Sequence, residues 1–347
     1  MLGRKYCALV FLLLVSLFLC SCNQRHHLVT KGFYYWKTIY KPTSFEVNTL
    51  HEMRAQKMYL RLFDVDWDMK AMQTVPVAPI QLPAHVDTSI DYVPVVFITQ
   101  NVLAQMQEKD AGKLAAQING FVKSLSDASG IHPSELQIDC DWTATTKTVY
   151  FLLLKELKAQ PFFKGKTLSC TIRLHQVKYF VSSGIPPVDK GMLMCYSMGD
   201  LKKYGNLNSI LNVVEADKYL ANIDKYPLPL DIALPLFQWC VLFHEQQFSG
   251  ILHDISPVMV INNSLFKQKQ GDLYACTRDT VWNGYSLTAN DVIRVESVPF
   301  NDLVDIAWFT SKRLKEQELN VVFFSCDSIT LSKYSTNELE TVYNTFR

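Results

Sequence analysis

The sequence lacks the residue spacings that bind metals or phosphates. Its nine cysteines include no C-x-x-C pair and no Cys/His ligand pattern, which excludes the common zinc modules. No glycine-rich loop follows any predicted strand, which argues against a dinucleotide-binding open sheet. We therefore predict neither a metal centre nor a cofactor.

A strong charge of one sign is also missing. The chain has 34 Lys and Arg against 33 Asp and Glu, a formal net charge of +1. Nucleic-acid-binding domains usually carry a clearly basic face, so we expect no nucleic-acid partner. Only one long apolar run exists, at residues 7–19, and it is shorter than the roughly 20 residues of a transmembrane helix.

The amino end has the three parts of a secretory signal. Arg4 and Lys5 precede the apolar run, and small residues follow it. Leu19-Cys-Ser-Cys22 resembles the lipobox of bacterial lipoproteins. That resemblance implies a signal peptide over residues 1–21, acylation of Cys22 and a lipid bilayer as partner. We expect a polar tether over residues 22–31 and a place in the bacterial cell envelope, at the periplasmic face of the outer membrane.

Six cysteines follow Cys22. Four of them lie inside short apolar runs typical of strands, at positions 140, 170, 195 and 326. Such cysteines behave as small buried hydrophobic residues. We expect few disulfides or none, although an exported protein is able to form them.

Apolar runs alternate with helical patterns along the rest of the chain. Predicted strands cover residues 33–39, 58–65, 93–99, 135–141, 167–174, 191–196, 230–237 and 321–326. Predicted helices cover residues 43–55, 110–125, 145–158, 206–220, 301–317 and 335–346. Eight such units favour a single (β/α)₈ barrel over residues 32–347, with a doubly wound open sheet as the competing fold.

The pattern departs from a regular barrel in three places. Residues 75–83 contain three prolines and look extended, so the helix after the second strand is missing or very small. Only residues 176–181 remain for a helix after the fifth strand. Residues 245–300 show hairpin-like alternation, which predicts a β-rich insertion.

Polar and aromatic residues gather where the predicted strands end. Chemistry in such barrels lies at the carboxyl ends of the strands. Side chains alternate along a strand, so Asp139 and Asp141 share the face that points into the barrel mouth, whereas Trp142 falls on the other face. The candidate catalytic residues are Asp64, Asp66, Asp139 and Asp141. The candidate substrate-binding residues are Trp142, Arg173, His175, Tyr196, Gln238 and Trp239. Packing in the core is the competing interpretation for both tryptophans.

Residues 136–143 resemble the fourth-strand signature of glycoside hydrolase family 18, Asp-Gly-x-Asp-x-Asp-x-Glu. Asp139, Asp141 and Trp142 match that segment, Met194-Cys-Tyr196 is similar to the sixth-strand Met-x-Tyr, and residues 233–237 resemble the seventh-strand Gly-x-Pro segment. The resemblance implies a chitinase-like barrel in which Asp141, helped by Tyr196, steadies the acetamido group of a glycan.

The departures from that family concern its chemistry. The proton-donating Glu falls on Thr143, the leading Asp on Leu136, and the Asp after the sixth-strand Tyr on Ser197. Threonine is no general acid, and protonation of the leaving oxygen is central to glycoside hydrolysis.

Three functions therefore stay open at the level of sequence. The first is a divergent glycosidase in which Asp139 and Asp141 act with a carboxylate from Asp64, Asp66, Glu245 or Asp327. The second is a glycan-binding lipoprotein without catalysis. The third is a structural envelope lipoprotein that uses the insertion as a contact surface.

Overall fold

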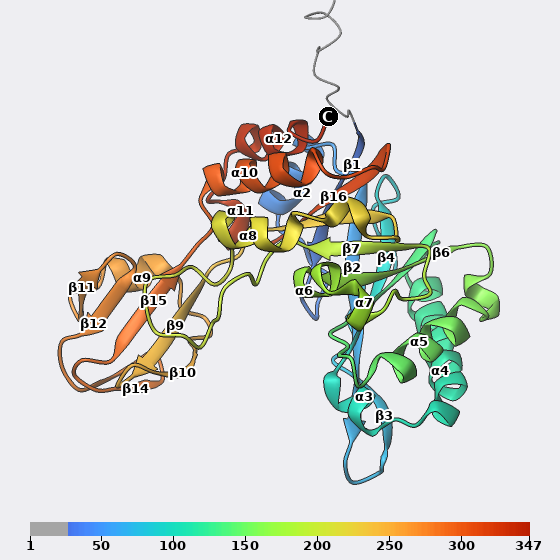
Figure 1. Cartoon of the computed structure of the whole chain (residues 1–347), viewed down its shortest axis with the longest axis horizontal. Helices are drawn as coiled ribbons and strands as arrows, with labels where there is room; N and C mark the ends of the chain where they lie inside the picture. Colours follow the sequence, from blue (N-terminus) through green and yellow to red (C-terminus); the bar gives the residue numbers. More distant parts are fainter. Residues whose placement is uncertain (1–26) are drawn as a thin grey trace, which may run out of the picture.

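The computed structural model describes residues 27–347, which form a parallel barrel and a smaller antiparallel sheet beside it (Figure 1). The predicted signal peptide, Cys22 and the first half of the predicted tether lie outside the described residues. Among those described, none of the helices combines the length and the hydropathy of a membrane-spanning segment.

The barrel is closed by eight parallel strands, which confirms the predicted fold. The first strand pairs with both the last and the second, so no edge remains between them. The strands are β1 (Leu28–Tyr35), β2 (Lys57–Asp68), β4 (Asp91–Ile98), β5 (Glu135–Cys140), β6 (Thr167–Arg173), β7 (Lys190–Met194), β8 (Leu230–Pro235) and β16 (Glu318–Phe324).

Helices pack around this barrel and bury its outer face. They are α2 (Ser44–Glu52), α3 (Gln100–Gln105), α4 (Ala111–Ala128), α5 (Lys147–Lys158), α6 (Leu174–Lys178), α7 (Phe180–Ser183), α8 (Val213–Leu220), α10 (Phe300–Ser311), α11 (Ser328–Leu331) and α12 (Thr336–Asn344). Short 3₁₀ turns lie at Glu108–Asp110, Pro161–Phe163 and Ile223–Lys225. Helix α2 begins at a capping box between Thr43 and Glu46, as the sequence predicts.

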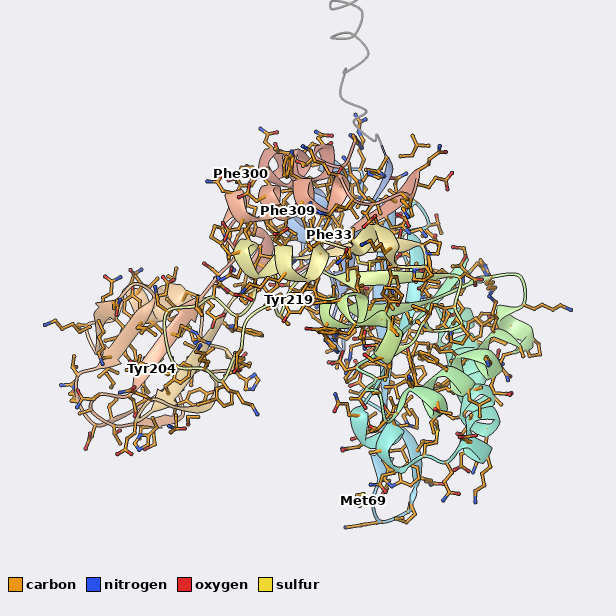
Figure 2. All side chains as sticks on the ribbon, viewed as in Figure 1. Phe33, Met69, Tyr204, Tyr219, Phe300 and Phe309 are labelled. Carbon is orange, nitrogen blue, oxygen red and sulfur yellow. The ribbon has the colours of Figure 1, made fainter. Side chains whose placement is uncertain are left out.

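The barrel is irregular where the sequence predicts it. After the second barrel strand the chain forms β3 (Gln73–Val77), which pairs with β2 in a hairpin instead of a helix. The hairpin extends beyond the barrel and carries Met69 near its tip (Figure 2). After β6 only the short helices α6 and α7 follow. The helix predicted over residues 206–220 is shorter and begins at Val213.

The first barrel strand begins earlier than predicted, which corrects the tether boundary at residue 31. Leu28 to Lys31 pair in parallel with Glu318 to Val321 of β16. His27 is buried, and its ring nitrogens lie 2.5 Å from the Glu316 carbonyl oxygen and 3.1 Å from that of Ser311. Polar residues at 27, 30 and 31 hide this strand in the sequence, because strand pairing and burial under α12 outweigh their composition.

The insertion begins earlier than the predicted span of residues 245–300. Strands β10 (Gln247–Ile251), β9 (Trp239–His244), β15 (Val292–Glu296), β12 (Leu273–Cys276) and β11 (Phe266–Gln270) form one antiparallel sheet in that order. It is accompanied by helix α9 (Pro257–Ile261) and the hairpin of β13 (Thr280–Trp282) and β14 (Tyr285–Leu287). The sheet has its own core, so it begins at Trp239, directly after the seventh barrel strand.

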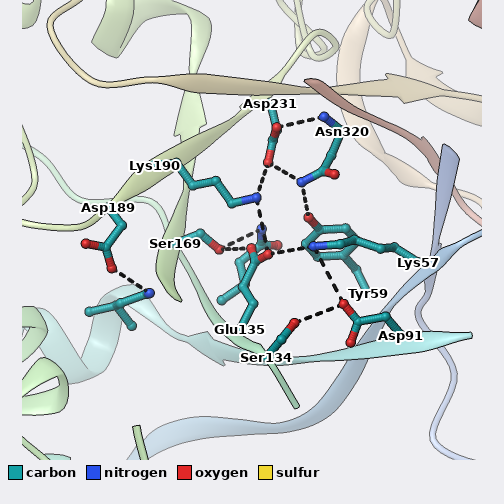
Figure 3. A network of polar contacts seen from close by, with 12 residues as sticks. Lys57, Tyr59, Asp91, Ser134, Glu135, Ser169, Asp189, Lys190, Asp231 and Asn320 are labelled. Atoms are coloured by element: carbon teal, nitrogen blue, oxygen red, sulfur yellow. Dashed lines mark hydrogen bonds and ion pairs between the residues drawn. The ribbon is translucent and has the colours of Figure 1, made fainter. Parts of the chain in front are cut away.

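The amino-terminal end of the barrel is closed by buried ion pairs (Figure 3). Glu135 lies 3.2 Å from the ammonium groups of both Lys57 and Lys190. Lys190 also lies 2.6 Å from Asp231, which accepts a hydrogen bond from the amide of Asn320. Paired charges thus occupy the inside of this end, and a pocket of about 340 Å³ lies beside Lys57, Lys190 and Asp231. Chemistry in barrels of this type lies at the opposite, carboxyl end of the strands.

All six cysteines of the described chain are free and buried. They include Cys140, Cys170, Cys195 and Cys326, in line with the hydrophobic role predicted for these four.

Candidate functional site

A pocket of about 370 Å³ opens at the carboxyl ends of β5, β6 and β7. Five of the predicted site residues line it: Asp141, Trp142, Arg173, His175 and Tyr196. The other lining residues are Gln100, Thr143, Leu174, Ser197 and Tyr219. The strand ends therefore bring together an acid, a base and an aromatic hydroxyl, as expected from their positions.

Asp139 lies at the floor of this mouth and is buried. It accepts a hydrogen bond of 2.6 Å from the Thr171 hydroxyl, and the Arg173 guanidinium lies 3.7 Å away. Burial raises the pKa of Asp139, and the opposing charge of Arg173 limits that rise. The carboxyl is thus shielded from solvent and held by two neighbours.

Asp141 reaches further out and keeps 42% of its side chain exposed. The Nε of Arg173 donates a hydrogen bond to its Oδ1, so one guanidinium serves both aspartates of the pair. Asp141 lines the pocket, and a carboxylate has two acceptor oxygens, so it is able to accept a further hydrogen bond from a ligand.

Tyr196 and His175 complete the polar lining. Tyr196 is buried and its hydroxyl lies 3.0 Å from the sulfur of Met194, and burial raises the pKa of this phenol. His175 is exposed at the rim. Partial burial lowers the pKa of His175, Asp141 opposes that change and Arg173 adds to it.

Asp64 and Asp66, two of the predicted catalytic residues, both interact with neighbouring groups. Asp64 forms a bidentate ion pair with Arg61, in which Nε lies 2.7 Å from Oδ1. A register shift between Arg61 and Phe63 puts these two side chains together, although residues three apart in a regular strand point to opposite faces. Asp66 accepts hydrogen bonds from the Thr99 hydroxyl and the Trp67 amide.

The two more distant carboxylates are also engaged elsewhere. Asp327 caps the amino end of α11 by accepting from the Thr330 amide at 2.9 Å. Glu245 lies in the exposed turn between β9 and β10, within the insertion. Neither is a second acid beside Asp139 and Asp141.

The predicted tryptophans have structural roles in the described chain. Trp142 is 2% exposed, stacks on Tyr150 with ring centroids 5.2 Å apart and donates to the Ser183 carbonyl. This corrects its assignment as a sugar-binding residue, because strand alternation turns it toward the helices. Trp239 is half-buried and donates from Nε1 to Glu296 at 3.0 Å. Gln238 is half-buried next to it.

Aromatic side chains form a wall at the mouth that the sequence does not predict as a group. Phe324 contacts four other rings at centroid distances of 5.5 to 5.9 Å, and Phe237 links this group to Trp239 at 5.2 Å. The four partners of Phe324 are Tyr34, Trp36, Tyr196 and Phe237. These residues come from the ends of β1, β7, β8 and β16, which are distant in sequence. Only strand order brings them together, although each follows an apolar run.

Thr143, which the resemblance to glycoside hydrolase family 18 aligns with its signature Glu, follows the end of β5. It is exposed at the rim, and its hydroxyl bonds with those of Thr145 and Thr146 just before α5. Within residues 27–347, no group of three or more His, Cys, Asp or Glu side chains is arranged to hold a metal ion.

Comparisons with known proteins identify the fold. No protein-family model and no curated protein matches the sequence. Among solved structures, the spore cortex-lytic enzyme SleL of Bacillus cereus is similar with a TM-score of 0.54 and 13% identity, over 92% of this chain and 75% of that one. A chitinase of Chromobacterium violaceum is similar with a TM-score of 0.52 and 8% identity, over 91% and 97% of the two chains.

A third similar structure is named for a different function. The chitinase-like agglutinin of Robinia pseudoacacia aligns with a TM-score of 0.52 and 11% identity, over 91% of this chain and 99% of that one. At these identities the similarity describes architecture. The chain thus has the (β/α)₈ barrel fold that chitinases and chitinase-like proteins share.

Proposed function

We propose that this chain binds a glycan at the barrel mouth and does not cleave it. The observation that carries the proposal is Thr143, an exposed hydroxyl at the position that the resemblance to glycoside hydrolase family 18 aligns with its signature Glu. General acid catalysis contributes about 10²–10⁴-fold to such reactions. A hydroxyl group cannot replace it, because its pKa is far too high to protonate a leaving oxygen.

The pairing of Asp139 and Asp141 also argues for binding rather than catalysis. Both carboxylates contact Arg173, and the acids on neighbouring strands have partners of their own. A glycosidase needs two carboxyl groups with separate roles on either side of the scissile bond.

The mouth nevertheless has the features of a sugar-binding surface. Asp141 is partly exposed and is available to accept an N–H or O–H group, and Tyr196 stands beside it. Aromatic rings along the wall offer flat apolar faces to pyranose rings. The similarity to an agglutinin with this barrel supports the same role.

A screen that scores binding and cleavage separately tests the proposal. The full-length protein is incubated with insoluble polymers of amino sugars, and bound protein and released reducing ends are measured. We expect retention without release, and we expect Asp141→Ala to weaken retention. Asp127→Ala is the matched control, because Asp127 is an equally exposed aspartate on α4 that pairs with Lys123. Release of reducing ends that disappears in Asp141→Ala contradicts the proposal.

A hydrolase is the second candidate. It is favoured by the raised pKa of Asp139, since acids in catalytic mouths often show such a shift. In this case the same screen detects reducing ends from the wild-type protein and none from Asp139→Asn.

We also propose that the chain is a lipoprotein attached through Cys22. The first barrel strand starts at the amino-terminal end of the barrel, opposite the mouth, and the last residues of the chain lie beside it (Figure 1). A lipid upstream of Leu28 would therefore leave the mouth directed away from the bilayer. Cell fractionation tests this: Cys22→Ser should move the protein from the membrane to the soluble fraction, and an unchanged distribution contradicts it.

A further inference from the structure

A lysine stands at the rim of the mouth between two tyrosine rings. Lys178 ends helix α6, and its ammonium group lies 5.0 Å from the ring centroid of Tyr219 and 5.3 Å from that of Tyr179. Tyr219 itself lines the mouth pocket, together with His175 one helical turn before the lysine. Lys178 is therefore at the edge of the proposed binding site.

This lysine differs from the other cations of the mouth. Arg173 and Arg61 are engaged by aspartates, whereas no carboxylate among residues 27–347 lies within 4.0 Å of the Lys178 ammonium group. Lys178 is exposed and so is Tyr179, whose side chain is 55% accessible. The aromatic faces hold the ammonium group in place without neutralising it.

We infer that the mouth recognises an N-acyl amino-sugar oligomer that carries a carboxylate. The inference rests on the proposed glycan-binding function and names its ligand class. Asp141 offers an acceptor for the N–H of the acyl group, and Lys178 offers the positive charge for the carboxylate. Asp141 directly follows β5 and lines the pocket with Tyr219, whose ring contacts Lys178, so an oligomer that extends along this wall would reach both groups.

The expected contribution of Lys178 is moderate. An exposed ion pair is weak, and a charge-assisted hydrogen bond on a side chain held by aromatic faces is stronger. Removing the charge should weaken binding of the acidic oligomer by about three- to ten-fold. Added salt should reduce the preference, since the lysine is at the surface.

The test uses pairs of oligomers that differ only in charge. The first probe alternates N-acetylglucosamine with N-acetylmuramic acid, whose lactyl carboxylate is free, and its partner has that carboxylate converted to an amide. The second pair alternates N-acetylglucosamine with glucuronate or with its amide. Dissociation constants are measured by calorimetry with the full-length protein in detergent, at low and high salt.

Two substitutions and a matched control complete the experiment. Lys178→Gln should abolish the preference for the acid over its amide, and Lys178→Arg should retain it. Lys218→Gln is the control, because Lys218 is an exposed lysine next to Tyr219 that already pairs with Glu215. Thermal unfolding of each variant verifies that it is folded.

Each outcome leads to a single conclusion. The inference is supported if either acidic oligomer binds more tightly than its amide and this preference is lost in Lys178→Gln alone. The acidic oligomer that binds more tightly identifies which carboxylate the site recognises. Equal binding of acid and amide, or a preference that survives in Lys178→Gln, overturns it while leaving glycan binding intact. Absence of binding to every oligomer overturns the proposed function and this inference with it.

Discussion

Glu296 accepts a hydrogen bond at 3.0 Å from the indole Nε1 of Trp239, its cross-strand partner at the base of the insertion. The same carboxylate accepts from the Ser209 hydroxyl at 2.7 Å and pairs with Arg294 at 2.5 Å. Arg294 in turn donates to three carbonyl oxygens of the loop over residues 201–205. The insertion is therefore fixed to the loop that follows Tyr196.

This relationship predicts that Glu296→Ala destabilises the junction strongly. Arg294 is 1% exposed, and removal of its partner leaves a buried charge uncompensated, which costs about 3–5 kcal/mol. Urea unfolding gives the free energy, and limited proteolysis should show new cleavage in the loop over residues 197–211. Glu245→Ala, in the exposed turn of the same sheet, should change stability by less than about 0.5 kcal/mol. Similar losses for both variants contradict the assignment.

The buried carboxyl of Asp139 predicts a pH dependence of stability. Its pKa is raised in the folded protein above the value of about 3.9 typical of an unfolded chain. Between these two values the folded state binds more protons than the unfolded state, so the contribution of Asp139 to stability is largest at low pH and is lost as the pH rises through the folded pKa.

Unfolding in urea from pH 4 to pH 7 tests that sign. The free energy of unfolding of the wild-type protein, relative to Asp139→Asn, should fall as the pH rises, because asparagine does not titrate. The hydrogen bond from Thr171 is available to either residue, which makes the comparison well matched. A free-energy difference that grows with pH contradicts this prediction.

The ion pairs at the closed end of the barrel predict a large effect of Lys190→Met. Lys190 contacts both Glu135 and Asp231, which are almost fully buried, so its loss leaves two carboxylates short of a partner. We expect a loss of about 3–5 kcal/mol in urea unfolding. Lys158→Met removes an exposed pair with Asp189 and should cost about 1 kcal/mol or less. The prediction fails if the two substitutions have the same effect.

The position of the first strand predicts where the folded chain has to begin. A chain that starts at residue 32 lacks Leu28 to Lys31, which pair with β16, and the buried ring of His27. We expect such a chain to melt at a clearly lower temperature than one that starts at residue 27, or to remain unfolded. Circular dichroism and gel filtration compare them, and equal melting temperatures would show that the earlier boundary is unimportant.

Local patterns in the sequence identify much of the site. The period of two along residues 136–142 assigns Asp139 and Asp141 to one face and Trp142 to the other. In the structure both aspartates contact Arg173, whereas the ring of Trp142 stacks on Tyr150 of α5. The ends of the apolar runs likewise locate Arg173, His175 and Tyr196. These features are local, because alternation and strand ends are properties of a few consecutive residues.

Other parts of the site depend on the assembled barrel. The pairing of Arg61 with Asp64 requires a register shift in β2, and no residue in that strand predicts such a shift. The aromatic wall around Phe324 requires strand order to bring β1, β8 and β16 together. The contacts of Arg173 with both aspartates likewise require β5 and β6 to be neighbours.

Patterns along the chain were enough to predict the alternation of strands and helices and the irregular segments. They did not show which charges neutralise one another, or which rim cation within residues 27–347 has no carboxylate beside it. Side-chain pairing depends on distances between strands, and closure of the barrel, rather than neighbours along the chain, fixes those distances.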